Sequence, residues 1–338
     1  MIDQRLFINL MRSMQLSNNN VDSIFKPSGY WSQYSNDMVK ALEGNGIYNF
    51  RSIPNKSLLA FATGNMFKPL KSEDSKFWIS HKILSRIPLF SLFTERYEKE
   101  INDAWTNAYT QAKYKLQLIK ENLKHNSPDL LKIKDPLIGN PIVFELDDQK
   151  YSEEFLYKLF EFSELRKKIN FSKINSIIEV GCSYGLLGSV IISMNKDINY
   201  FFVDMAPVPA ITFYYLNKLF PSRVRLIPEK KEYSEFNSLT SESCNIKIIC
   251  AHDLPLVKEK YDLFINTSSF QEMDINQVKY YCDFIKQNTH KCYLNNNKKS
   301  QYNKIDTEWY LSALNPMKVE SEWNDIIYSS YQPIILSN

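Results

Sequence analysis

The sequence predicts an α/β protein in which a Rossmann-like, mostly parallel sheet follows an N-terminal, mainly helical domain. From about residue 150 onward, short apolar runs alternate with helix-like segments, which is typical of a parallel sheet covered on both faces. Before about residue 140, apolar residues recur with the helical period, and no alternating strands are evident. We therefore expect a helical cap over residues 1–145 and a sheet domain over residues 146–338.

The helices of the first domain are predicted from the spacing of their apolar residues. One helix is expected over residues 95–123, with one face formed by Ile101, Ala104, Trp105, Ala108, Ala112, Leu116, Ile119 and Leu123. Another begins at Tyr30-Trp31 and should stop at Gly44 and Gly46. Prolines and a Gly-Asn-Pro turn between residues 126 and 141 mark the end of the helical region.

The second domain should contain strands and helices in alternation. Ser152 is a candidate N-cap, and Glu153 and Glu154 suit the positive end of the helix that follows it. Strands are expected at residues 174–180, 200–204, 246–251, 261–266 and 292–295, with helices at 186–193, 210–220 and 276–287. The run 224–227 is either an extra strand or part of a connection. Residues 318–320 and 326–331 suit an antiparallel pair that closes the sheet.

A glycine cluster marks the expected ligand site. Three of the chain's eight glycines, Gly181, Gly185 and Gly188, fall between the first strand and its helix. Glycine permits left-handed backbone and close approach of a ligand, and a helix N-terminus offers free N–H groups. Because ligands of open α/β sheets bind beyond the carboxyl ends of the strands, the polar residues there should converge. Close packing of helix on strand would explain the glycines without a ligand.

Two cofactors fit a loop of this kind. NAD requires Gly-x-Gly-x-x-Gly, and Ser183 and Leu186 stand at the second and third glycine positions when the motif starts at Gly181. S-adenosylmethionine carries no pyrophosphate, and its loop usually reads acid-x-Gly-x-Gly-x-Gly. The run from Glu179 to Gly185 keeps the acid and the outer glycines. Asp204, at the end of the second strand, can accept hydrogen bonds from both ribose hydroxyls. The alternative is that Asp204 is a solvated turn residue. S-adenosylmethionine is therefore the predicted cofactor, with contacts to Glu179, Gly181, Ser183, Tyr184, Gly185, Asp204, Met205, Asp253 and Asn266.

Composition excludes several other classes. A hydrophobic fraction of 44% is enough for a core, and the net charge of +3 is spread over short basic clusters that read as solvated faces. We therefore expect no nucleic-acid partner. No long apolar run or secretory signal is present, which favours a cytoplasmic protein without membrane insertion and with five reduced cysteines. The four histidines are scattered, so no metal site is predicted, although a divalent ion held by carboxylates would leave only a weak signature.

The chain resembles the sugar O-methyltransferases of bacterial surface-polysaccharide gene clusters. The resemblance rests on Gly139-Asn-Pro141, on Ile178-Glu-Val-Gly-Cys-Ser-Tyr-Gly185, on Val203-Asp204 with the following Tyr214-Tyr215-Leu216, and on Phe264-Ile-Asn-Thr-Ser-Ser-Phe-Gln-Glu-Met273. It covers about residues 139–296 and is thin before them, limited to Tyr30-Trp31 and Phe50-Arg51. Cys182, Ser183 and Leu186 depart from the family's small residues. The resemblance implies a class I S-adenosylmethionine-dependent methyltransferase that modifies a sugar hydroxyl.

Transfer of a methyl group to a sugar hydroxyl needs a base that removes a poorly acidic proton. Glu272 is the first candidate, because the resemblance makes its Gln-Glu-Met setting functional; a helix-terminal carboxylate is the alternative. His252 is the second candidate, since its pKa suits proton transfer near neutrality, and a turn residue before Pro255 is its alternative. Asp253 is expected to bind the adenine amino group.

The acceptor is expected to be a sugar or a sugar nucleotide. Tyr30, Trp31 and Arg51 suit a sugar ring and a phosphate, although aromatic residues at helical spacing are more often part of a core. Gln271 and Asn295 are the other candidates for substrate binding. An NAD(P)-binding oxidoreductase and a methyltransferase for a non-sugar acceptor stay open as alternatives, as does a homo-oligomeric state.

Overall fold

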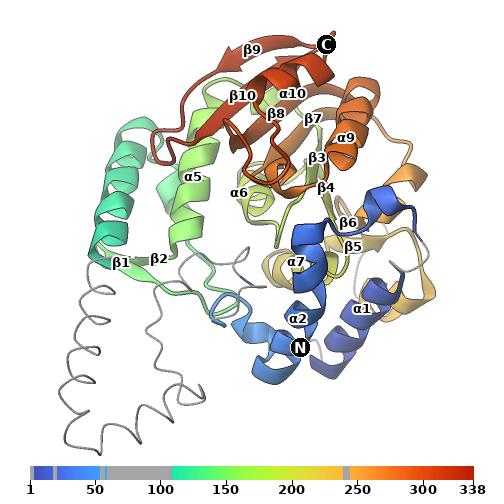
Figure 1. Cartoon of the computed structure of the whole chain (residues 1–338). Coiled ribbons are helices and arrows are strands. Elements are labelled where there is room, and N and C mark those ends of the chain that lie inside the picture. The colour runs from blue at the N-terminus through green and yellow to red at the C-terminus, as the bar shows by residue number, and fades with distance from the viewer. Residues whose placement is uncertain (1–3, 18–20, 54–57, 59–108, 239–243) are drawn as a thin grey trace, which may run out of the picture.

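An eight-stranded sheet forms the centre of the molecule (Figure 1). The computed structural model describes residues 4–17, 21–53, 58, 109–238 and 244–338. The strand order is β5-β6-β4-β3-β7-β8-β10-β9. The strands are β3 (Ser176–Val180), β4 (Asn199–Asp204), β5 (Val224–Ile227), β6 (Ile246–Cys250), β7 (Tyr261–Thr267), β8 (Thr289–Asn297), β9 (Lys318–Glu322) and β10 (Tyr331–Ser337). The sheet is parallel from β5 to β8, and β10 runs antiparallel to both of its neighbours.

Alternate residues of the strands face two separate helix layers, as the continuous apolar runs of the strands require. On one face, Ile177 of β3 and Tyr200 and Phe202 of β4 share a hydrophobic cluster with three helices. On the other face, Ile178 and Phe201 belong to a second cluster. The first layer contains α5 (Glu153–Arg166), α6 (Leu186–Met194) and α7 (Val208–Leu219), and the second contains α9 (Ile275–Asn288) and α10 (Thr307–Ala313). The predicted α/β sheet is confirmed.

The described N-terminal helices pack on the first of these layers. They are α1 (Gln4–Ser17) and α2 (Gly29–Asn45), and Figure 1 shows both beside α7. Phe7 of α1 meets Tyr214 of α7 edge to face, with ring centroids 5.8 Å apart. The predicted stop of α2 is confirmed at Gly46, which follows the helix with a φ of +83°, whereas Gly44 lies inside the helix. The buried residues of α1 and α2 belong to the same cluster as α5, α6 and α7.

The helix expected over residues 95–123 is described from residue 109, and it is helical through residue 126. Its predicted face is buried at Ala112, Leu116, Ile119 and Leu123. The other four positions of that face precede residue 109 and lie outside the described residues.

Three features of the sheet domain differ from expectation or were left open. The strand expected at residues 326–331 is wrong, because β10 begins only at Tyr331. Pro333 stands inside β10, at the point where pairing with β9 ends. The backbone N–H of Trp323 donates to the Pro333 carbonyl there. The strand therefore tolerates a proline, which is unfavourable in the middle of a sheet. The run 224–227 is the edge strand β5. A small hairpin of β1 (Phe144–Leu146) and β2 (Gln149–Tyr151) was not predicted.

The sequence signal at the start of α5 is confirmed. Ser152 caps α5, and its hydroxyl accepts from the backbone N–H of Phe155. All five cysteines are free.

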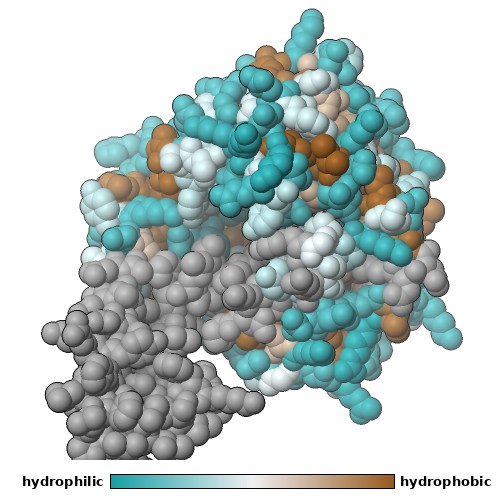
Figure 2. Space-filling view, in the orientation of Figure 1, coloured by the Kyte–Doolittle hydropathy of each residue, from teal (hydrophilic) through white to brown (hydrophobic). Residues whose placement is uncertain are grey.

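On the face drawn in Figure 2, hydrophobic residues are dispersed among hydrophilic ones. Within the described residues, no helix combines the length and the apolar character that crossing a membrane requires.

Candidate active site

The glycine loop joins the end of β3 to the start of α6. Gly181 has a φ of +72°, and a Cβ atom there would lie 2.0 Å from the Ser269 hydroxyl oxygen, so two segments meet at this backbone. Gly188 has a different role, because a Cβ atom would lie 2.3 Å from the Phe202 ring. Gly188 therefore serves the packing of α6 on β4. Ser183 also has a positive φ of 53°, and Gly185 is the left-handed N-cap of α6.

Two acidic residues flank this loop from neighbouring strands. Asp204 accepts the backbone N–H groups of Ser183 and Met205, both at 2.8 Å. Glu179 accepts the Tyr200 hydroxyl at 2.8 Å. Burial raises the pKa of each carboxyl group to about 7, against the effect of these hydrogen bonds. Burial thus brings the pKa of both carboxyl groups close to neutral pH.

Two cavities lie beside the loop and share part of their walls. The first, of about 210 Å³, contains Asp204, Met205, Val208 and Ala251. The second, of about 380 Å³, contains Glu179, Cys182 and Tyr184. The residues that line both are Trp31, Gly181, Ser183, Thr267, Ser268 and Glu272. The loop after β7 and the glycine loop thus form the junction of the two cavities.

Glu272 lies at this junction, in a short 3₁₀ turn (Phe270–Glu272) after β7. The indole Nε1 of Trp31 donates to Glu272 Oε2 at 3.0 Å. Burial raises the pKa of Glu272 to about 7, and the hydrogen bond from Trp31 opposes that rise. A carboxylate with a pKa near neutrality is suited to accept a proton at physiological pH.

The N-terminal segment forms part of the first cavity and is fastened to the loop that carries Glu272. The Ser28 hydroxyl donates to the Glu272 backbone carbonyl at 2.9 Å. The side-chain amide of Gln277, on α9, donates to the carbonyls of Ile24 and Lys26 at 2.9 and 2.7 Å. The lining residues from this segment are Phe25, Lys26, Pro27, Ser28 and Trp31.

The second cavity has an aromatic and charged wall that sequence analysis missed. Tyr157 and Lys158 enter from α5, and Tyr328 and Tyr331 enter from the C-terminal region. Lys158 Nζ donates to Glu161 Oε2 at 2.6 Å and to the Thr267 hydroxyl at 3.3 Å. Glu154 lines the same cavity. Tyr157 and Lys158 fall on the exposed face of the helix predicted after Ser152, and this position was the available sequence signal for the wall. Only the fold brings Tyr328 and Tyr331 opposite them.

The structure places several predicted binding residues inside the protein network rather than on the cavity walls. Arg51 is fully buried, and its guanidinium donates to the Ser152 hydroxyl at 2.6 Å and to the Ile138 carbonyl at 3.3 Å. This arrangement does not present Arg51 to a substrate phosphate; it joins the N-terminal region to α5. Tyr30 lies in α2, and its side chain is outside the described residues.

Three polar residues at the strand ends are also engaged internally. Gln271 accepts the backbone N–H of Asn297 at 2.8 Å, and Asn295 donates to Glu161 at 2.7 Å. Asn266 donates to the Val180 carbonyl at 2.8 Å and so ties β7 to the end of β3. None of these three lines either cavity. Their hydrogen bonds instead hold together the strand ends around the site.

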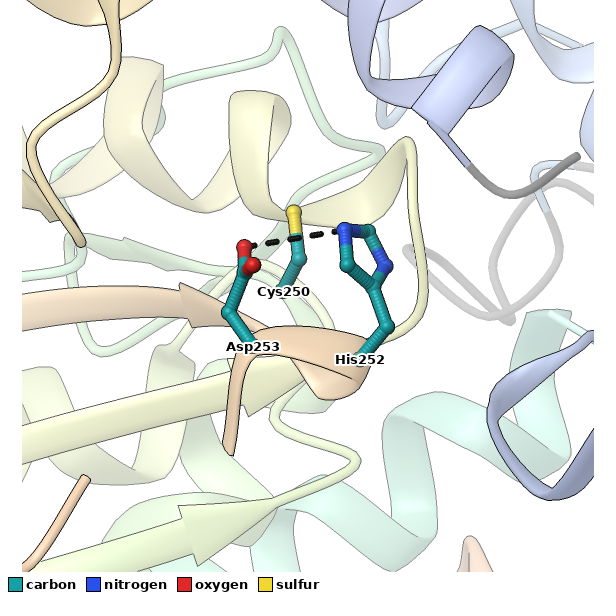
Figure 3. Close-up of side chains that lie close together, drawn as sticks. All are labelled: Cys250, His252 and Asp253. Carbon is teal, nitrogen blue, oxygen red and sulfur yellow. Dashed lines mark ion pairs between the residues drawn. The ribbon is translucent and has the colours of Figure 1, made fainter. Parts of the chain in front are cut away.

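Cys250, His252 and Asp253 form a compact cluster at the end of β6 (Figure 3). One ligand atom from each lies within 4.8 Å of the others, as a metal site would need. However, Lys230 Nζ donates to Asp253 Oδ2 at 2.6 Å and already supplies a positive charge there. Burial also raises the pKa of the Cys250 thiol to about 12, which opposes the thiolate that a metal requires.

Neither His252 nor Asp253 lines the two cavities. His252 Nε2 instead lies 3.2 Å from the Ser17 hydroxyl at the end of α1, and burial lowers the His252 pKa. Asp253 is paired with Lys230, and its contact with an adenine amino group stays a prediction. Glu272, the other predicted base, is the one that the fold brings to the junction.

This sheet, with β10 antiparallel between β8 and β9, is the Rossmann-like sheet of class I methyltransferases. Solved structures with a similar fold include magnesium protoporphyrin IX methyltransferase (ChlM) from Synechocystis PCC 6803 with bound SAM (S-adenosylmethionine), at 9% identity and a TM-score of 0.40, over 66% of this chain and 97% of that one. M. capricolum TrmK, in complex with S-adenosyl-homocysteine, aligns at 14% identity and a TM-score of 0.36, over 53% and 67% of the two chains.

The mitomycin 7-O-methyltransferase MmcR aligns at 9% identity and a TM-score of 0.38, over 55% of this chain. The aligned region spans 57% of the length of MmcR. These likenesses are ones of fold. No model of a protein family matches the sequence, and no curated protein matches it.

Proposed function

We propose that this protein transfers a methyl group from S-adenosylmethionine to a hydroxyl group of a sugar, with Glu272 as the base. The observation that carries the proposal is the meeting of two cavities at Glu272, beside a glycine loop on a class I methyltransferase sheet. A donor in one cavity and an acceptor in the other would face each other across this carboxylate. The proposal places both reactants within reach of one base.

The first cavity suits the adenosine part of the donor. Met205, Val208 and Ala251 offer apolar contact for a flat base, and Asp204 offers carboxylate oxygens for ribose hydroxyls. The positive φ angles of Gly181 and Ser183 turn the loop backbone beside this cavity. S-adenosylmethionine, when bound, supplies an electrophilic methyl group. The residues of the chain bind and orient it.

The second cavity suits a sugar ring. Tyr157, Tyr328 and Tyr331 present aromatic surface, on which the C–H faces of a sugar can pack, while Glu154 and Lys158 can pair with hydroxyl groups. Glu272 would accept the proton of the hydroxyl that is methylated. The same tyrosines also favour a second candidate acceptor, a flat phenol. The NAD(P) alternative has less support, because Ser183 and Leu186 stand where its loop needs glycines.

The direct test is methyl transfer from labelled S-adenosylmethionine to a panel of nucleotide sugars, free glycosides and phenols, with NAD-linked reduction assayed in parallel. Transfer to sugars and not to phenols supports the proposal. Transfer to phenols alone would replace the sugar by the second candidate. Binding of NAD without any response to the methyl donor would overturn the whole assignment.

The donor should bind in the micromolar range, roughly −8 kcal/mol, and should depend on Asp204. Asp204→Asn keeps the size of the side chain and removes its charge, so we expect a loss of ~1–3 kcal/mol in the binding of S-adenosylhomocysteine, measured by calorimetry at pH 8. Asp197→Asn, an exposed change in the turn before β4, is the matched control. Equal affinity in the two variants would remove Asp204 from the donor site.

Turnover should rise with pH through about 7, because Glu272 must be ionised to accept a proton and its pKa is raised to about 7. Below that pH the carboxyl group is protonated and cannot act as a base. The measurement is kcat at saturating donor and acceptor, since Asp204 and Glu179 would then affect binding rather than the proton transfer. A flat profile between pH 6 and 8 would contradict the role of Glu272.

A further inference from the structure

Trp31 connects the N-terminal region directly to the proposed base. Its indole N–H donates to Glu272 Oε2 at 3.0 Å across 241 residues of sequence. Both side chains line both cavities. Among the residues that the structure describes, Trp31 is the one side chain that hydrogen-bonds the Glu272 carboxylate. The second carboxylate oxygen, Oε1, is therefore left for a ligand.

The contact is held from both sides, so the indole and the carboxylate keep their mutual position. Trp31 lies in the first turn of α2, and the Ser28 hydroxyl just before that helix donates to the Glu272 carbonyl at 2.9 Å. Gln277 then fastens the preceding segment through the carbonyls of Ile24 and Lys26. The Trp31 ring also meets Tyr34 edge to face, with centroids 6.0 Å apart.

We propose that Trp31 is the positioning residue of Glu272. It binds Oε2 and thereby directs Oε1 to the junction where the donor and acceptor cavities meet. This inference rests on the proposed function of Glu272 and adds a role for the N-terminal region, because a residue of α2 sets the geometry of a base on the sheet domain.

Removal of the indole N–H should also change the acidity of Glu272. Burial is the larger effect and raises the Glu272 pKa, while the Trp31 hydrogen bond lowers it. Without that bond the pKa should therefore rise further. The other charged and titratable groups that line the two cavities stay in place in such a variant, so the shift of the Glu272 pKa reports the loss of the N–H group. These unchanged groups are Lys26, Glu154, Tyr157, Lys158, Glu179, Cys182, Tyr184, Asp204, Tyr281, Tyr328 and Tyr331.

The first experiment compares Trp31→Phe with Trp309→Phe, a change on α10 outside both cavities. Trp31→Phe keeps an aromatic ring and removes the donor. We expect S-adenosylhomocysteine affinity within a few-fold of the parent, kcat lowered about tenfold, and the midpoint of the pH–kcat profile moved upward by roughly half a unit to one unit. Trp309→Phe should leave the midpoint unchanged. A loss of thermal stability in Trp31→Phe with an unmoved midpoint would indicate a purely structural residue and overturn the proposal.

A second measurement does not depend on turnover. The chain has five tryptophans, and the indole ¹H–¹⁵N signal of Trp31 can be assigned by its absence in Trp31→Phe. That signal should titrate with a midpoint near the Glu272 pKa, and the titration should vanish in Glu272→Gln. A signal that does not move between pH 5 and 9 overturns the positioning role while leaving the proposed methyl transfer intact. A signal that titrates while Glu272→Gln keeps full turnover overturns Glu272 as base, and Trp31 with it.

Discussion

Glu272→Gln is expected to lower kcat by roughly 10²–10⁴, the usual contribution of a positioned base. Glutamine keeps the size and can still accept the indole N–H of Trp31, but it cannot take up a proton. Donor affinity should hold within a few-fold, because the first cavity keeps Asp204 and its apolar wall. The measurement is kcat with labelled donor and the acceptor found by the panel, together with calorimetry of S-adenosylhomocysteine.

His252→Asn is the comparison variant for this experiment. His252 lines neither cavity and lies against Ser17, so we expect turnover within a few-fold of the parent. If the His252 change abolishes turnover and the Glu272 change does not, the base is His252 and the ranking of the two is wrong. If neither change matters, neither Glu272 nor His252 is the base, and the proposed proton transfer to Glu272 is wrong.

Arg51→Met should lower the free energy of unfolding by about 3–5 kcal/mol, the usual cost of removing one partner of a buried ion pair. The Arg51 guanidinium is fully buried among Asp135, Glu154 and the Ser152 hydroxyl. Methionine fills much of the space but leaves the carboxylates without the compensating charge. Urea denaturation followed by circular dichroism measures the loss.

The matched control is Arg166→Met, which removes an Arg–carboxylate pair with Asp129 that is partly exposed to solvent. Exposed pairs contribute about 0–1 kcal/mol, so the control should change stability little. Similar losses in the two variants would show that the carboxylates around Arg51 find other partners, and that the joint between the N-terminal region and α5 does not depend on this residue.

The fold was predictable because its signals are local. The apolar runs that form β3, β4, β6, β7 and β8 are each flanked by helix patterns, and the glycine loop after β3 stands out in a glycine-poor chain. One strand was placed wrongly: it was expected at residues 326–331, whereas β10 begins at Tyr331 and contains Pro333, at the point where ladder pairing with β9 ends.

The candidate site was predictable only in part. Glu272, Asp204 and the glycine loop follow strand ends, which the topology brings to one edge, so sequence alone could group them. The contact between Trp31 and Glu272 depends on how α2 packs against the sheet domain, and Arg51 was assigned to a ligand because its burial cannot be read from the chain. Tyr157 of the second cavity comes from α5, whereas Tyr328 and Tyr331 come from the region of β10, and no local pattern links them.

The insertion of β10 between β8 and β9 also constrains the order in which the sheet can be completed during synthesis. β9 emerges from the ribosome before β10, yet β9 joins the sheet through β10. Until residues 331–337 emerge, the edge of β8 has unpaired backbone groups, and β9 has no strand to pair with. Open strand edges of this kind invite association with other chains. We therefore expect the nascent protein to depend on chaperone protection until β10 has left the exit tunnel.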